Sequence, residues 1–187
     1  GNKAISYFLK YGFPANRLIN LPILFETNIQ LSNKKILSKK LFEKYKITTE
    51  NFLISAGSRL IFEKGYDILI EAIGLLDNQI KKNIKIVIVG LGPEKDNLIT
   101  LIKKRRLEQH IILEHWLSIK EFSELITVSN VFIHPARFDA YGGSALAMTL
   151  GTPVIGSTKA GAAVDKIKHG INGFVFQSEN INELKLY

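Results

Sequence analysis

The sequence predicts an α/β fold in which helices cover both faces of a parallel sheet of about six strands. From residue 52 onward, short β-branched or apolar runs alternate with segments in which apolar residues recur at helical spacing. The expected strands are residues 52–56, 85–89, 111–114, 131–134, 153–156 and 173–176. Strands that alternate with helices along the chain are typical of a doubly wound, Rossmann-like sheet.

The expected helices follow the strands in order. Between the first two strands, apolar residues fall on one helical face, namely Ile68, Leu69, Ala72, Ile73 and Leu76. Residues 96–106 repeat this spacing after the second strand. Ser118 followed by Glu121 has the pattern of a capping box, which predicts that a third helix begins there. A last helix is expected to begin at Ile181.

The first 50 residues lack this alternation. Residues 2–11 are expected to form a helix that ends at residues 12–14, Gly-Phe-Pro. Residues 17–21 are expected to form a strand that ends at Pro22. Residues 33–46 are rich in lysine and carry apolar residues at helical spacing, which favours a solvated amphipathic helix over a membrane-surface patch.

Composition limits the class of protein. The chain has 187 residues, 46% of them hydrophobic and 22% charged, so it can bury the core of one ordinary domain. It has no cysteine, which excludes disulfides, thiolate nucleophiles and zinc–thiolate sites. No apolar run approaches the roughly 18 to 20 residues of a membrane span and no signal-peptide pattern opens the chain, so we expect a cytoplasmic protein. The net charge of +8 favours anionic partners.

The order of the strands predicts where a ligand binds. Ligands of open parallel sheets bind beyond the carboxyl ends of the strands, at the point where the strand order reverses. In the common order 3-2-1-4-5-6, this point lies between the first and fourth strands. The loop after the first strand carries Arg59 and Lys64. The loop after the fourth carries Arg137, Asp139 and a pair of glycines at 142–143.

These side chains suit a diphosphate. Arginine binds two phosphate oxygens through its planar guanidinium, lysine adds a compact charge, and glycines before a helix let backbone amides approach the anion. No metal is then required. The alternative is that the cations are surface charges and that the glycines only shape a tight turn. The convergence of two loops favours the phosphate site.

Other ligand motifs are incomplete or absent. Residues 90–93, Gly-Leu-Gly-Pro, form only part of a dinucleotide fingerprint, and the sequence contains no phosphate-binding loop of the ATPase type. The four histidines lack metal-like spacing, and His134 at the end of a strand is expected to bond a backbone group. The basic run 103–106 is interpreted as a solvated helix end, so no nucleic-acid partner is expected.

Several motifs occur in the order and spacing of a known family. They are residues 58–60 (Ser-Arg-Leu), 63–67 (Glu-Lys-Gly-Tyr-Asp), 89–93 (Val-Gly-Leu-Gly-Pro), 134–137 (His-Pro-Ala-Arg), 139–142 (Asp-Ala-Tyr-Gly), 151–155 (Gly-Thr-Pro-Val-Ile), Gly161 and 170–173 (Gly-Ile-Asn-Gly). Over about residues 50–180 the chain resembles glycosyltransferase family 4, within group 1. The resemblance implies the carboxyl-terminal, donor-binding half of a retaining enzyme of the GT-B architecture, which has two Rossmann-like domains.

The resemblance also implies a division of the chain. Residues 1–28 resemble the last helix and strand of a missing acceptor domain, residues 29–50 form a basic linker or helix, and residues 51–187 form the domain that binds the nucleotide-sugar donor. The acceptor, a glycan or a lipid-linked molecule, is then held by the missing domain. The implied setting is the synthesis of cell-envelope polysaccharide in the cytoplasm, with peripheral association at the inner face of the membrane.

Site residues are carried over by the same resemblance. Arg59 and Lys64 would hold the donor diphosphate and stabilise the leaving nucleotide. Asp139 stands where the family has the first glutamate of a carboxylate pair, near hydroxyls of the donor sugar. The other implied donor-binding residues are Gly57, Ser58, Gly90, His115, Trp116, Tyr141, Gly142, Gly143 and Ser144. A UDP-sugar is the favoured donor, and no metal or other cofactor is expected.

One departure from the family concerns its second glutamate, which binds the nucleotide ribose. Leu146 or Ala147 stands at its place, and the segment from Asp139 to Gly151 is one residue shorter than the family pattern. A lost charge-assisted hydrogen bond weakens binding by about 1.5 to 3 kcal/mol. An alternative interpretation is therefore a nucleotide-binding or scaffolding domain without catalytic activity. A nucleotide-sugar epimerase or a phosphorylase of the same architecture is a third.

Overall fold

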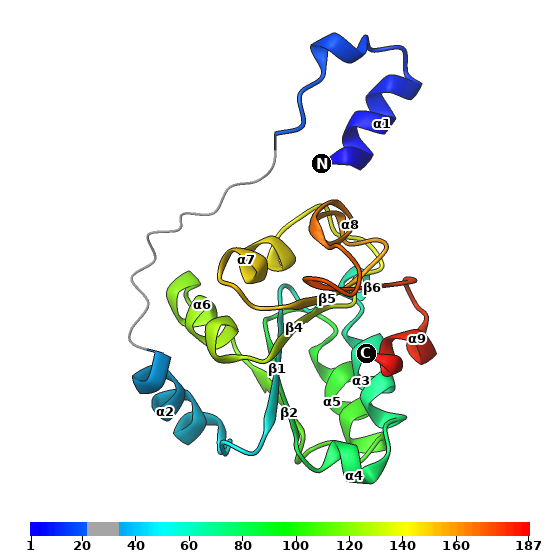
Figure 1. Cartoon of the computed structure of the whole chain (residues 1–187). Helices are drawn as coiled ribbons and strands as arrows, with labels where there is room; N and C mark the ends of the chain where they lie inside the picture. Colours follow the sequence, from blue (N-terminus) through cyan, green and yellow to red (C-terminus); the bar gives the residue numbers. More distant parts are fainter. Residues whose placement is uncertain (22–33) are drawn as a thin grey trace.

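The computed structural model of the chain describes residues 1–21 and 34–187. The described residues form one six-stranded parallel sheet with the order β3-β2-β1-β4-β5-β6 (Figure 1). The strands are β1 (Phe52–Gly57), β2 (Ile84–Val89), β3 (Ile111–Glu114), β4 (Val131–His134), β5 (Val154–Ser157) and β6 (Gly173–Phe176). The expected fold class and strand order are confirmed, and each expected strand end lies within one residue of the observed one.

Helices lie on both faces of this sheet (Figure 1). Helices α3, α5 and α9 pack on one face, whereas α2, α6 and α7 pack on the other, with α8 against α7 and β5. The helices and short 3-10 turns (η) are α1 (Asn2–Lys10), η1 (Ala15–Arg17), α2 (Lys34–Tyr45), η2 (Phe62–Lys64), α3 (Tyr66–Gly74), α4 (Asn78–Lys81), α5 (Lys95–Lys104), α6 (Ile119–Val128), α7 (Gly143–Thr149), α8 (Gly161–Lys166) and α9 (Ile181–Leu186).

The central strands are apolar because both of their faces are buried. Side chains alternate between the two faces of a strand. Accordingly, Ile54 and Ile86 pack with residues of α3 and α5, whereas Leu53 and Val87 pack with residues of α2 and α6. A strand buried in this way has a nearly continuous apolar sequence, which explains why the runs were visible without any alternation of polar residues.

The start of α6 is fixed by the capping box that the sequence predicts. The N–H of Glu121 donates to the hydroxyl of Ser118 at 3.2 Å. In return, the carboxylate of Glu121 accepts the N–H of Ser118 at 2.9 Å. Two N–H groups that the helix leaves unpaired are therefore satisfied at its first turn.

Replacing Ser118 by alanine is expected to lower the free energy of unfolding by about 1 kcal/mol, because the N–H of Glu121 loses its acceptor. Urea denaturation measures the change. The control is Thr49→Ala at an exposed turn, where a shift within about 0.5 kcal/mol is expected. Equal shifts for the two variants would show that the capping box adds nothing to stability.

The amino-terminal segment lies apart from the sheet, beside α8 (Figure 1). The N–H of Asn2 donates to the carboxylate of Asp165 at 3.1 Å, and Lys3 Nζ donates to the carbonyl of Thr158 at 2.6 Å. The expected helix is confirmed as α1. The strand expected at 17–21 is wrong: Arg17 ends η1, and residues 18–21 are paired with no strand of the described chain. Leu18 has an extended backbone, but a strand forms only where a neighbour accepts its hydrogen bonds.

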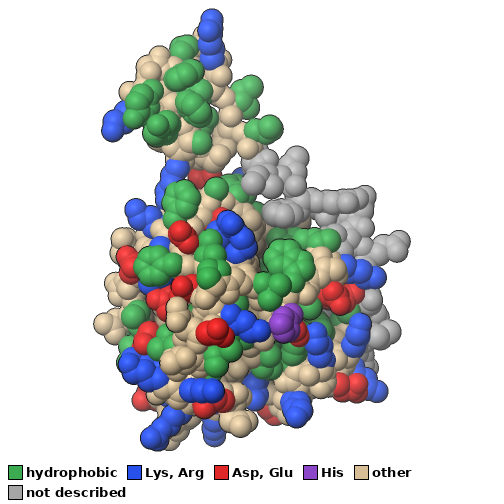
Figure 2. Space-filling view, turned by 180° about the vertical axis from the view of Figure 1, so that it is seen from behind, with side chains coloured by type: hydrophobic (Ala, Val, Ile, Leu, Met, Phe, Trp, Pro, Cys, Tyr) green, Lys and Arg blue, Asp and Glu red, His purple; other side chains and the backbone are tan. Residues whose placement is uncertain are grey.

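This segment exposes aromatic side chains. Tyr7, Tyr11 and Phe13 are each more than half exposed, at 58%, 63% and 51%. Figure 2 shows hydrophobic side chains gathered on the segment at the top of the molecule, whereas charges of both signs are interspersed over the body below it. An apolar surface of this kind is typical of a face that packs against a partner. Residues 22–28, the rest of the expected acceptor-domain remnant, lie outside the described residues.

The lysine-rich helix is amphipathic, as predicted. Leu37, Leu41 and Tyr45 of α2 are buried against the sheet and α6, whereas Lys39 and Lys40 are exposed. The expected helix is confirmed for this part, and residues 29–33 lie outside the described residues. Within the two described ranges, none of the helices has the length and apolarity needed to cross a membrane.

Candidate functional site

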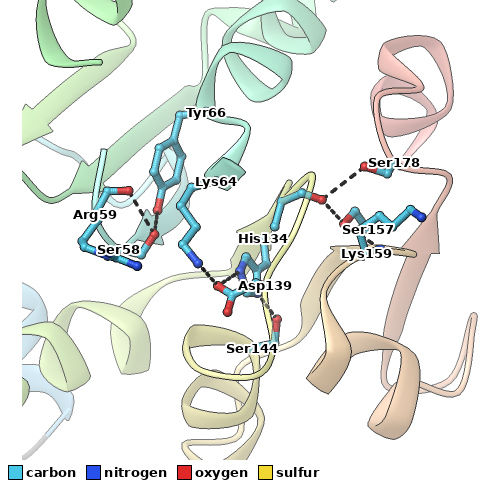
Figure 3. A network of polar contacts seen from close by, with 11 residues as sticks. Ser58, Arg59, Lys64, Tyr66, His134, Asp139, Ser144, Ser157, Lys159 and Ser178 are labelled. Carbon is cyan, nitrogen blue, oxygen red and sulfur yellow. Dashed lines mark hydrogen bonds and ion pairs between the residues drawn. The ribbon is translucent and has the colours of Figure 1, made fainter. Parts of the chain in front are cut away.

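A polar network lies at the carboxyl ends of β1 and β4, the two strands between which the strand order reverses (Figure 3). Lys64 at the end of η2 and Asp139 in the loop after β4 meet in an ion pair, with Nζ 2.7 Å from Oδ2. Their side chains are only 11% and 15% exposed. The sequence predicts that these two loops lie at one crevice. In the structure, the ion pair between one cation and one carboxylate joins them.

Backbone contacts hold these two loops against each other. The carbonyl of Glu63 accepts the N–H groups of both Arg137 and Phe138, at 2.8 and 3.0 Å. Gly65, which follows Lys64, has a left-handed backbone with φ of 67°. A Cβ atom there would collide with the carbonyl of Pro135, so only glycine allows this approach.

Arg137 does not face the crevice with Lys64. Its guanidinium donates to both carboxylate oxygens of Asp67, at 2.8 and 2.6 Å, and its Nε donates to Glu179 at 2.9 Å. The guanidinium also lies 4.0 Å from the ring centre of Phe62. The sequence-based grouping of Arg137 with the crevice cations is thus wrong, because Arg137 instead links the loop after β4 to α3 and to the segment after β6.

His134 bonds side chains and not the backbone group expected from the sequence. It is the last residue of β4 and is buried. Its Nε2 lies 2.9 Å from Asp139 Oδ2, and its Nδ1 lies 2.6 Å from the hydroxyl of Ser144 in α7. These bonds could not be predicted from the sequence, because they depend on how the loop after β4 folds back over the strand end.

The carboxylate of Asp139 is charged throughout the physiological pH range. Burial opposes its ionisation, but hydrogen bonds from His134 and Lys64 outweigh burial, and together with their charges they lower the pKa of Asp139 to about 2. An ionised carboxylate accepts hydrogen bonds and donates none.

This lowered pKa predicts how stability depends on pH. Ionised Asp139 stabilises the folded chain above its unfolded pKa of about 4, and this contribution is lost as the pH falls toward about 2. The expected loss is about 1 to 2 kcal/mol after allowance for solvent that screens the part-exposed group. Asp139→Asn removes the titration, so urea denaturation between about pH 5 and pH 2 should give a flatter profile for the variant. Parallel profiles would contradict the assignment.

The loop after β1 adds a second polar cluster beside Lys64 (Figure 3). The hydroxyls of Ser58 and Tyr66 are 2.6 Å apart, and burial raises the pKa of the Tyr66 phenol well above its usual value. Tyr66 belongs to the motif at residues 63–67, but it is not among the expected site residues. Arg59 is exposed, and its guanidinium has no hydrogen bond or ion pair to the described part of the chain.

The glycines of the expected site allow close packing. A Cβ on Gly57 would lie 2.7 Å from the ring of Phe122, and one on Gly143 would lie 2.7 Å from the ring of Phe132. A Cβ on Gly90 would collide with the carbonyl of Ser58. Gly142 has a φ of 91° at the start of α7, with open space around it.

The remaining expected residues lie at the edges of the network. Tyr141 is buried with Ala145 of α7, so its ring packs in the core. His115 and Trp116 follow β3 and are exposed, Trp116 at 65%. They lie at the same edge of the sheet, but no contact joins them to Lys64 or Asp139 within the described residues. The residues that the structure describes also contain no cluster of His, Asp and Glu that could hold a metal ion.

Comparison with known proteins decides the family. A family model described as "Glycosyl transferases group 1" matches residues 38–187. The chain belongs to this family. Two glycosyltransferases of polysaccharide synthesis are among its relatives. The O-antigen biosynthesis glycosyltransferase WclY of Escherichia coli is 31% identical over 71% of this chain and 35% of its own length. The capsular polysaccharide biosynthesis glycosyltransferase CapM of Staphylococcus aureus is 28% identical over 87% of this chain and 42% of its own length.

Two solved structures share the fold. Anabaena Alr3699/HepE in complex with UDP superposes with a TM-score of 0.85 at 24% identity, over 100% of this chain and 50% of that one. WaaG, a glycosyltransferase of lipopolysaccharide biosynthesis, gives a TM-score of 0.79 at 24% identity, over 99% of this chain and 51% of its own. The group 1 chain thus spans less than half of the two relatives and about half of these structures.

The positions that the resemblance to family 4 assigns to a second glutamate are apolar in this group 1 chain. Leu146 and Ala147 are both buried in a cluster with Ile126 and Phe132. Neither position offers a polar group to the crevice. The departure seen in the sequence is therefore a feature of the folded site.

Proposed function

We propose that the chain is the donor-binding half of a retaining glycosyltransferase of family 4, and that it binds a nucleoside-diphosphate sugar, with a UDP-sugar favoured. The observation that carries the proposal is the meeting of Lys64 and Asp139 at the reversal of strand order. Structures of Anabaena HepE with UDP, with UDP and glucose, and with UDP-glucose support the choice of donor.

Each part of the site has a role in this proposal. Exposed Arg59 and the ammonium of Lys64 bind the diphosphate and stabilise the charge that develops on the leaving nucleotide. The carboxylate of Asp139 accepts a hydrogen bond from a hydroxyl of the sugar. Backbone amides at 141–144 approach the sugar and phosphate, and the loops at Gly90 and 115–117 line the nucleotide. Two cations supply the charge that a metal would otherwise provide, so no metal ion is needed.

In this proposal the acceptor is held by the other domain of the GT-B architecture and not by the donor-binding half. The exposed aromatic face of α1 fits a segment that packs within that half. Relatives named for O-antigen and capsular polysaccharide synthesis support a glycan or lipid-linked acceptor. In this proposal, a lipid-linked acceptor would bring the full-length enzyme to the inner face of the membrane.

A second candidate function follows from the apolar positions Leu146 and Ala147. Without a second carboxylate, the domain would bind nucleotide as a scaffold and transfer no sugar. Transfer assays on the full-length protein separate the two candidates. A transferase loses activity in Arg59→Ala or Lys64→Ala, whereas a scaffold has none in the wild type.

Calorimetry of this chain with UDP, GDP and ADP tests the donor site directly. The proposal expects one of the three to bind in the millimolar range or tighter, and Lys64→Ala to weaken that binding. Lys82→Ala, at an exposed lysine outside the crevice, is the control and should bind as the wild type does. If none of the three nucleotides binds at millimolar concentration, the proposal is wrong.

A further inference from the structure

His134 joins two residues of the site without being open to solvent itself. It is 5% exposed, and Ser144 behind it is fully buried. The imidazole is held at both nitrogens, by Asp139 at Nε2 and by Ser144 at Nδ1. Its partners lie five and ten positions later in the chain, on the loop after β4 and in the first turn of α7.

The charge of Asp139 fixes the role of His134 Nε2. The charged carboxylate of Asp139 only accepts, so His134 Nε2 carries the proton and donates it. The hydroxyl of Ser144 bonds Nδ1, because a hydroxyl can either donate to this nitrogen or accept from it. Rotation of the ring would break both bonds. The orientation of His134 is therefore set by the fold and not by a ligand.

Both donors to Asp139 reach the same carboxylate oxygen. Lys64 Nζ and His134 Nε2 lie 2.7 and 2.9 Å from Oδ2. Oδ1 accepts no hydrogen bond from the described residues, and Figure 3 shows it without a dashed line. Two donors on one oxygen hold the carboxylate in one orientation and leave its second oxygen available.

The His134 bond matters because Lys64 has two tasks in the proposed site. When the ammonium of Lys64 turns toward a diphosphate, its ion pair with Asp139 weakens, because its three N–H groups are then shared between the diphosphate and the carboxylate. His134 keeps the carboxylate in place when this happens. The arrangement Ser144–His134–Asp139 contains the residue types of a hydrolytic triad, but the hydroxyl of Ser144 is fully buried and no substrate can reach it.

We propose that His134, held by Ser144, is a positioning residue that fixes Asp139 so that its Oδ1 meets a hydroxyl of the donor sugar. The inference rests on the proposed function, because only a bound donor gives Oδ1 a partner. It predicts a selective effect. A nucleoside diphosphate without its sugar does not contact Oδ1, so its affinity should not depend on His134.

The test compares each nucleoside diphosphate with its glucose conjugate by calorimetry on this chain: UDP with UDP-glucose, GDP with GDP-glucose and ADP with ADP-glucose. In His134→Ala, the affinity for the conjugate that the wild type binds is expected to fall about fivefold to tenfold, while the affinity for the free diphosphate stays within about twofold. Ser144→Ala should show the same selective loss to a smaller degree. His134→Gln should retain the wild-type ratio, because its amide donates to Asp139 and accepts from Ser144.

The outcomes separate the inference from the proposed function. A wild type that binds none of the six ligands overturns both. A wild type that binds, with a conjugate-to-diphosphate ratio unchanged in both His134→Ala and Ser144→Ala, overturns only the role of His134. Should His134→Ala fail to fold, Ser144→Ala carries the comparison.

The hydrogen bonds of His134 with Asp139 and Ser144 can also be tested without any ligand. Nitrogen-15 NMR of the His134 ring is expected to show a proton on Nε2 at neutral pH. An Nε2 without a proton would overturn the inference.

Discussion

Lys64→Ala is expected to lower sugar transfer by the full-length protein about 100-fold to 1,000-fold. The substitution removes the ammonium that would stabilise the departing diphosphate, and it leaves the buried carboxylate of Asp139 with His134 as its remaining donor among the described residues. Release of nucleoside diphosphate from the donor, followed under single-turnover and steady-state conditions, measures the loss. In the present chain, the affinity for the nucleoside diphosphate should fall about 10-fold to 100-fold.

Two further variants isolate the charge of Lys64 from its packing. Lys64→Met keeps most of the side-chain length and should lose nearly as much activity as Lys64→Ala. Lys82→Met makes the same chemical change at an exposed position and should leave activity unaltered. If Lys64→Ala transfers sugar at a rate within about threefold of the wild-type rate, Lys64 has no catalytic role in the proposed site.

Gly65→Ala should destabilise the fold by about 3 to 5 kcal/mol. The backbone of Gly65 has a φ of 67°, and a Cβ there would collide with the carbonyl of Pro135. Both loops of the site would have to separate to relieve the clash. Urea denaturation measures the loss, and nucleotide binding should weaken with it, because Lys64 and Asp139 move apart.

Gly170→Ala is the matched control. Gly170 has a similar φ of 77°, but no atom lies within 4 Å of a Cβ built on it. Only the strain of the left-handed backbone remains, and it is expected to destabilise by about 1 kcal/mol. Equal losses in the two variants would show that the contact with Pro135 has no energetic role.

The sheet could be predicted because its information is local. Residues 86–89 are apolar without interruption, and a run of that kind within an alternation of strands and helices indicates a strand buried on both faces. The capping box at Ser118 marks a helix start in the same local way. The strand expected at 17–21 was wrong because pairing needs a neighbouring strand, which the sequence of the segment itself does not specify.

The site could be predicted at the level of loops but not of contacts. Parallel strands bring their carboxyl ends to one edge, so Lys64 and Asp139 were expected in one crevice before their ion pair was seen. The partners of Arg137 and His134 depend on turns that no spacing rule describes. Arg137 and Lys64 look equivalent as cations in the sequence, yet the fold assigns one to Asp67 and the other to Asp139.

The carbonyl of Glu63 accepts two N–H groups from the loop after β4. The two loops of the site are therefore already held together before a ligand binds. Segments already ordered in the free protein lose little conformational entropy when a ligand arrives. For this chain, the unfavourable entropy of association should therefore come mainly from the ligand itself and from the exposed residues after β3.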